Sequence, residues 1–142
     1  MRHCLVVAHQ TLDSPRLADA ILEEASKGPC TFHLLVPVFH HGDGLTWTDA
    51  EVRSVAQDHL DAALLRFRAD GFAVDGEVAG PSPVDAVSDA LIRDGAHAYD
   101  LVIVSTLPHV ISRWLKIDVP TRIEQNTGLP VRHVEAPAKA PH

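Results

Sequence analysis

Five short runs along the chain are apolar enough, or rich enough in β-branched residues, to predict β-strands. The first and fourth runs are almost continuously apolar, which is typical of strands buried on both faces of a sheet. The third run carries a weaker strand pattern than the others. The predicted strands cover residues 4–8, 31–39, 72–78, 101–104 and 129–134.

Between these runs, apolar residues recur at helical spacing, and each stretch is introduced by a residue that can cap a helix. Thr48 and Glu51 are three residues apart, which is the spacing of a capping box. Gly28 and Gly71 mark the ends of the first two helices, and prolines at positions 15, 83 and 120 suit a first helical turn. The predicted caps are Asp13 or Ser14, Thr48, Ser82, Ser112 and Asp118.

Strands and helices therefore alternate along the chain, and this order favours a parallel sheet with helices on both faces. No internal repeat or linker interrupts residues 1–135, which predicts one α/β domain. Residues 136–142 contain two prolines and three alanines and are predicted to be a disordered tail.

Composition excludes several classes of protein. With 12 Lys and Arg against 19 Asp and Glu among 142 residues, the net charge is −7, which argues against a basic nucleic-acid module. No apolar run approaches the roughly 18 residues of a membrane span, and the first residues lack a signal-peptide layout. The two cysteines, Cys4 and Cys30, do not indicate a disulfide framework, so we expect a cytoplasmic protein.

In open α/β sheets, ligands bind beyond the carboxyl ends of the strands, where the strand order reverses. If the order is 3-2-1-4-5, that point lies between the first and fourth strands. Polar residues gather in the loops predicted for this edge, and the start of the helix after the fourth strand favours an anion. The candidate ligand-binding residues are His9, Gly80, Ser105, Thr106, His109, Ser112 and Arg113.

Plainer interpretations stand beside these candidates. Ser112 and Arg113 could bind an anion at the start of the helix after the fourth strand, with Trp114 supplying an aromatic face to the ligand. Equally, Ser112 can be an ordinary helix cap, Arg113 a surface residue and Trp114 a side chain packed over the sheet. Ten histidines are an unusual number. His9, His109 and either His40 or His41 could hold a metal, but scattered polar histidines are the favoured interpretation, and no metal site is predicted.

Four segments, in their order and spacing, resemble those of the universal stress protein family, within the adenine-nucleotide α-hydrolase-like superfamily. The resemblance extends to about Val134. The segments that carry it are Cys4-Leu5-Val6-Val7-Ala8, Val78-Ala79-Gly80-Pro81 with Asp85-Ala86-Val87, Asp100-Leu101-Val102-Ile103-Val104, and Leu129-Pro130-Val131-Arg132-His133-Val134.

The resemblance implies a five-stranded parallel sheet of order 3-2-1-4-5, a homodimer formed through the fifth strand, and ATP or another adenine nucleotide as a candidate ligand. Members that bind ATP use an acidic residue after the first strand and the loop G-x-x-G-x9-G-(S/T) after the fourth. Here His9 occupies the acidic position, Ser105 and Pro108 the leading glycine positions, and Ile117-Asp118 the closing pair. Pro108 offers no N–H to a phosphate, so these departures argue against the family's mode of ATP binding.

The sequence thus predicts a non-enzymatic domain that binds a small anion, such as a nucleotide, between the first and fourth strands. One alternative is a small hydrolase or nucleotide-processing enzyme that uses His9 or His109 as acid or base. Another is an interaction module with an empty crevice. No nucleophile elbow, phosphate-binding P-loop or metal-hydrolase helix motif occurs in the sequence.

Overall fold

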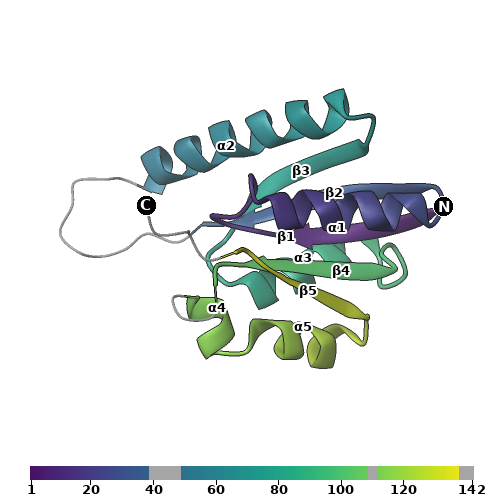
Figure 1. Cartoon of the computed structure of the whole chain (residues 1–142). Coiled ribbons are helices and arrows are strands. Elements are labelled where there is room, and N and C mark those ends of the chain that lie inside the picture. Colours follow the sequence, from purple (N-terminus) through teal and green to yellow (C-terminus); the bar gives the residue numbers. More distant parts are fainter. Residues whose placement is uncertain (39–48, 109–111, 138–142) are drawn as a thin grey trace.

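A parallel β-sheet with helices on both faces forms the body of the molecule in the computed structural model (Figure 1). The structure describes residues 1–38, 49–108 and 112–137. Its elements are β1 (Arg2–Val7), α1 (Pro15–Ser26), β2 (Cys30–Pro37), α2 (Asp49–Ala69), β3 (Ala73–Ala79), α3 (Pro83–Asp94), β4 (Leu101–Thr106), α4 (Arg113–Lys116), α5 (Val119–Thr127) and β5 (Val131–Glu135).

The five strands are parallel and stand in the order β3-β2-β1-β4-β5, which confirms the predicted fold. Strand β1 lies in the middle, where Cys4 pairs with Phe32 of β2 and with Leu101 of β4. From β1 the chain adds β2 and β3 on one side of the sheet and then β4 and β5 on the other. The strand order therefore reverses between β1 and β4, whose carboxyl ends are neighbours.

The core has two halves, one on each face of the sheet. Because successive side chains of a strand point to opposite faces, Val6 joins the half under α1 and α2 while Leu5 and Val7 join the other half. Phe67 of α2 packs in the first half, and Ile123 of α5 packs in the second. Both faces of β1 and β4 are thus covered, which explains their continuous apolar runs.

The helix caps expected from the sequence are present at three described positions. The side chains of Ser82, Ser112 and Asp118 accept hydrogen bonds from the backbone N–H groups of Asp85, Leu115 and Thr121. Ser14 occupies the N-cap position of α1, but its side chain makes no capping hydrogen bond. Thr48 lies outside the described residues.

Strand β4 extends two residues further than its apolar run predicts. Ser105 pairs with Val134 of β5 and Thr106 pairs with Glu135, so ladder contacts continue through residues expected to end the strand. The backbone N–H of Ala136 then donates to the carbonyl of Thr106. None of the described helices is long and apolar enough to cross a membrane.

Candidate functional site

Buried hydroxyl groups line the junction between the carboxyl ends of β1 and β4. Thr11, from the loop after β1, is 3% exposed, and Ser105, at the end of β4, is 1% exposed. Their Oγ1 and Oγ atoms lie 2.6 Å apart and share a hydrogen bond. The bond connects the loop before α1 to β4. It therefore holds together the two segments that meet at the switch point, the place where the strand order reverses.

Ser14 brings another buried hydroxyl to the loop that carries Thr11. Its backbone N–H donates to the carbonyl of Thr11, which folds the loop into a turn just before α1. The side chain is 8% exposed, and its Oγ atom has no hydrogen-bond partner among the described residues. A buried hydroxyl without a partner costs about 1–3 kcal/mol, so such groups usually mark a place where water or a ligand binds.

The structure separates Thr106 from Ser105, because adjacent residues of a strand face opposite sides of the sheet. The Oγ1 atom of Thr106 lies 2.7 Å from Nε2 of His133 in β5. Ser105 faces α1, whereas Thr106 helps to bind β5 to β4 on the other face. The sequence placed both hydroxyls at one site and assigned no role to His133; the structure leaves only Ser105 beside Thr11.

At Ser112, the structure favours the plainer interpretation. The Ser112 hydroxyl caps α4, a helix of only four residues. Trp114 is buried in the core half formed with α3 and α5, so it does not present an open aromatic face to a ligand. His109 and the side chain of Arg113 lie outside the described residues, and the proposed anion grip stays a prediction.

Gly80 and His9 occupy different parts of the carboxyl edge. His9 lies between the end of β1 and Thr11, and it is half-buried. Gly80 follows β3, which is separated from β1 by β2, and it lines a different hollow of about 440 Å³ beside Ser82 and Asp85. Of the predicted site residues, the structure therefore brings His9 and Ser105 to the same strand junction but not Gly80.

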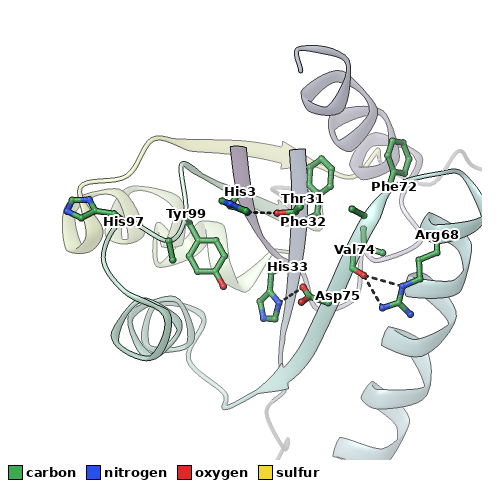
Figure 2. A pocket seen from close by; sticks show the side chains of 12 residues that line it. His3, Thr31, Phe32, His33, Arg68, Phe72, Val74, Asp75, His97 and Tyr99 are labelled. Carbon is green, nitrogen blue, oxygen red and sulfur yellow. Dashed lines mark hydrogen bonds and ion pairs between the residues drawn. The ribbon is translucent and has the colours of Figure 1, made fainter. Parts of the chain in front are cut away.

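A second concave region lies at the opposite, amino-terminal edge of the sheet (Figure 2). It is a groove of about 720 Å³ whose walls come from the first residues of β1, β2 and β3 and from the loop before β4. Three histidines to which the sequence pattern assigned no role line it: His3, His33 and His97. Part of the histidine surplus is thus concentrated far from the predicted site.

His33 is the best-connected histidine of this groove. Its Nδ1 atom lies 2.6 Å from Oδ1 of Asp75, and its Nε2 atom lies 2.7 Å from Oε2 of Glu77. Both partners are carboxylates, which accept hydrogen bonds from ring N–H groups. Asp75 and Glu77 belong to β3, so His33 of β2 binds the edge strand through its side chain as well as its backbone.

The His33 cluster continues onto α3 and the loop that follows it. Arg93 approaches Glu77 to 2.7 Å, and its hydrogen bond is the main reason that the pKa of Glu77 lies below its ordinary value, followed by that from His33. Arg93, followed by the Tyr99 hydroxyl, also lowers the pKa of Asp94. These charges already satisfy one another, so we assign the cluster a structural role.

We predict that His33→Ala lowers the free energy of unfolding by about 1 kcal/mol, because two cross-strand hydrogen bonds to carboxylates of β3 are lost. His59→Ala is the matched control, since His59 is exposed on α2 and its loss should change stability by less than about 0.5 kcal/mol. Urea unfolding of both variants measures the difference. Equal stabilities would contradict a role of His33 in holding the edge strand.

No cluster of three or more His, Cys, Asp or Glu side chains with the geometry to hold a metal ion occurs among the described residues. The alternative metal site weighed from the sequence depends on His109 and on His40 or His41, which lie outside those residues. The described part of the chain therefore offers hydroxyl, imidazole and backbone groups at the switch point, which suit hydrogen bonding to a small polar or anionic molecule.

Comparison with known proteins relates this fold to solved structures. No protein-family model matches the sequence, and no curated protein matches it. The universal stress protein from Archaeoglobus fulgidus superposes with a TM-score of 0.62 at 16% identity, covering 94% of this chain and 93% of that one. Its dAMP complex gives 0.62 at 14% identity, with 94% and 97% covered. An AMP-bound universal stress protein family protein from Arabidopsis thaliana gives 0.61 at 13% identity, with 97% and 94% covered.

These similarities extend over nearly the whole chain and confirm the predicted resemblance at the level of the fold. Sequence identities of 13–16% carry no residue roles across. The chain has the fold of universal stress proteins, and its ligand has to be argued from its own side chains.

Proposed function

We propose that this chain is a non-enzymatic, cytoplasmic member of the universal stress protein family that binds a small anion at the β1–β4 junction. A nucleoside monophosphate is the first candidate ligand. The observation that carries the proposal is the buried junction of Thr11, Ser14 and Ser105, in which the Ser14 hydroxyl has no partner among the described residues. Two proteins of the same fold are described with dAMP and AMP bound, which supports the choice of ligand.

Departures from the family's glycine-rich loop shape the proposal further. Ser105 is buried against Thr11 at one of the positions where a glycine would expose its backbone, and Pro108 carries no N–H group at the other. A triphosphate needs several free N–H groups, whereas a single phosphate or a ribose can be bound by hydroxyls. We therefore expect AMP or dAMP to bind more tightly than ATP.

Assembly is the second part of the proposal. Strand β5 is the last strand in the sheet order, and its pairing with β4 leaves its outer backbone edge open within the described chain. An unpaired edge can be covered by a second copy of the chain. We infer a homodimer formed through β5, and light scattering of the purified protein measures the mass that tests it.

Calorimetric titration of the purified protein with AMP, dAMP, ATP and inorganic phosphate tests the proposed ligand. We expect Ser14→Ala and Ser105→Ala each to weaken AMP binding about tenfold, the effect of losing one hydrogen bond of about 1.4 kcal/mol. Ser54→Ala is the control, because it makes the same chemical change at an exposed position of α2.

Flat titrations with all four compounds would contradict ligand binding and favour the interaction module. Binding that neither Ser14→Ala nor Ser105→Ala weakens would place the ligand elsewhere. If the protein converts a bound nucleotide to products and His9→Ala abolishes this turnover, the result would instead favour the alternative of a nucleotide-processing enzyme.

A further inference from the structure

The two cysteines of the chain face each other across neighbouring strands. The Sγ atoms of Cys4 in β1 and Cys30 in β2 lie 3.2 Å apart, and both thiols are free. Arg2 pairs with Cys30 and Cys4 pairs with Phe32 in the strand register, so the two cysteines are diagonal neighbours. Both side chains belong to the core half beneath α1 and α2, so they point to the same face of the sheet.

We propose that Cys4 and Cys30 are a modification site, at which a hydroperoxide oxidises the two thiols to a reversible disulfide within the chain. A disulfide has an S–S length of about 2.05 Å, so the sulfur atoms have to approach by about 1 Å. Cys30 is the first residue of β2 and follows Gly28 and Pro29, so only the start of the strand has to shift.

Exposure assigns different roles to the two thiols. Cys30 is half-buried and can be reached by a small oxidant, whereas Cys4 is fully buried. Burial, followed by the hydrogen bond from Cys30, raises the pKa of Cys4 to about 12, so Cys4 itself reacts slowly with peroxide. Cys30 is therefore the sulfur that reacts first with peroxide, and Cys4 is the resolving thiol because its Sγ atom lies 3.2 Å from that of Cys30.

The reaction balances with hydrogen peroxide as the only co-reactant. Peroxide converts the Cys30 thiol to a sulfenic acid, its O–O bond breaks, and one water leaves. The Cys4 sulfur then attacks the Cys30 sulfur and displaces the hydroxyl group, which leaves as a second water with the Cys4 proton. The two thiols together lose two electrons, which reduce the peroxide, and one S–S bond replaces two S–H bonds.

The bond would close a loop that contains the candidate site. The segment between Cys4 and Cys30 includes the rest of β1, the hydroxyls of Thr11 and Ser14, and all of α1. Disulfides that close loops of this length restrict the unfolded chain and stabilise the native state. We expect the oxidised protein to melt roughly 5–10 °C above the reduced protein and to return to the reduced value with dithiothreitol.

Mass spectrometry of the full chain tests the site directly. The reduced protein is treated with hydrogen peroxide, denatured in the presence of iodoacetamide and weighed intact. We expect a product that has lost the mass of two hydrogen atoms, takes up no iodoacetamide and yields a peptide linking Cys4 to Cys30. Dithiothreitol should restore two alkylatable thiols.

Cys4→Ala and Cys30→Ala serve as matched controls, because each leaves one thiol that cannot form the bond. In Cys4→Ala we expect Cys30 to accumulate sulfenic and then sulfinic acid under the same treatment. The proposal is overturned if wild-type Cys30 reaches sulfinic acid without linking to Cys4, if the disulfide joins two chains, or if both thiols stay alkylatable. Because the decisive measurement uses the wild-type protein, a variant that fails to fold does not weaken the test.

Discussion

Replacing Glu24 by alanine is expected to lower the free energy of unfolding by about 2–4 kcal/mol, the largest single effect that the structure predicts. Glu24 lies on α1 and is 2% exposed, and its carboxylate binds three cations, two of which come from strands β1 and β5. Arg132 of β5 lies 2.7 Å away, Arg2 of β1 lies 3.0 Å away, and Lys27 lies 3.1 Å away. Without the carboxylate, the three like charges repel one another and lose the hydrogen-bond acceptor that they share.

Glu23→Ala is the matched control for this variant. Glu23 precedes Glu24 on α1 and also binds Arg132, at 2.9 Å, but its side chain is 61% exposed. Exposed ion pairs contribute at most about 1 kcal/mol, so Glu23→Ala should be nearly neutral. Urea unfolding monitored by circular dichroism compares the two variants, and equal losses of stability would show that burial of the Glu24 pair is unimportant.

The pH dependence of stability follows from the same carboxylate. Burial by itself would raise the pKa of Glu24, but the hydrogen bonds from Arg132, Arg2 and Lys27 outweigh it and lower the pKa from 4.5 to about 2. A pKa depressed in the folded state contributes stability that is fully present above pH 4.5 and is lost as the pH falls toward 2. In Glu24→Ala, this part of the acid-induced loss should disappear.

Much of the fold could be predicted because the positions of strands and helices depend on properties that short segments carry. Continuous apolar runs marked β1 and β4 as central strands, and Ser82, Ser112 and Asp118 marked helix starts with their own hydroxyl or carboxylate groups. These signals are local, and the alternation of elements then restricts the topology to a few arrangements. The resemblance to universal stress proteins selected among them.

The contacts that matter most to the sites could not be predicted. They depend on the register between strands and on the face of the sheet to which each side chain points. Thr11 and Ser105 are 94 residues apart, and Glu24 and Arg132 are 108 apart. An error of one residue in register would turn Ser105 of β4 and Arg132 of β5 to the other face of the sheet. Thr11 could still have been suspected, since it lies in the loop that the predicted topology places opposite the end of β4.

The partners of the histidines could not be predicted for the same reason. The sequence places His9 and His109 near the switch point because both follow predicted strands. His33 sits inside a predicted strand, where nothing in its neighbours along the chain suggests a partner, yet it bridges Asp75 and Glu77 of the next strand. Cys4 and Cys30 are comparable, because each appears in an apolar segment and only the β1–β2 pairing brings the thiols together.

The second large effect is expected at Gly76, the residue between the two carboxylates that bind His33. A Cβ atom at this position would lie 2.9 Å from the backbone carbonyl oxygen of Leu34 and 2.9 Å from Cδ1 of Leu60. Both contacts are too short, and both neighbours are fully buried, so neither can move freely. Gly76→Ala is therefore expected to lower the free energy of unfolding by about 1–3 kcal/mol.

Gly80→Ala is the control, because a Cβ atom there would meet nothing within 4 Å. That substitution should be neutral or stabilise by up to about 1 kcal/mol, since alanine restricts the unfolded chain. Thermal and urea unfolding of both variants measure the contrast. If Gly76→Ala were as stable as Gly80→Ala, β3 would have to lie further from β2 and α2 than the structure shows. The carboxylates of Asp75 and Glu77 would then no longer be held against His33 by the close approach of the backbone at Gly76.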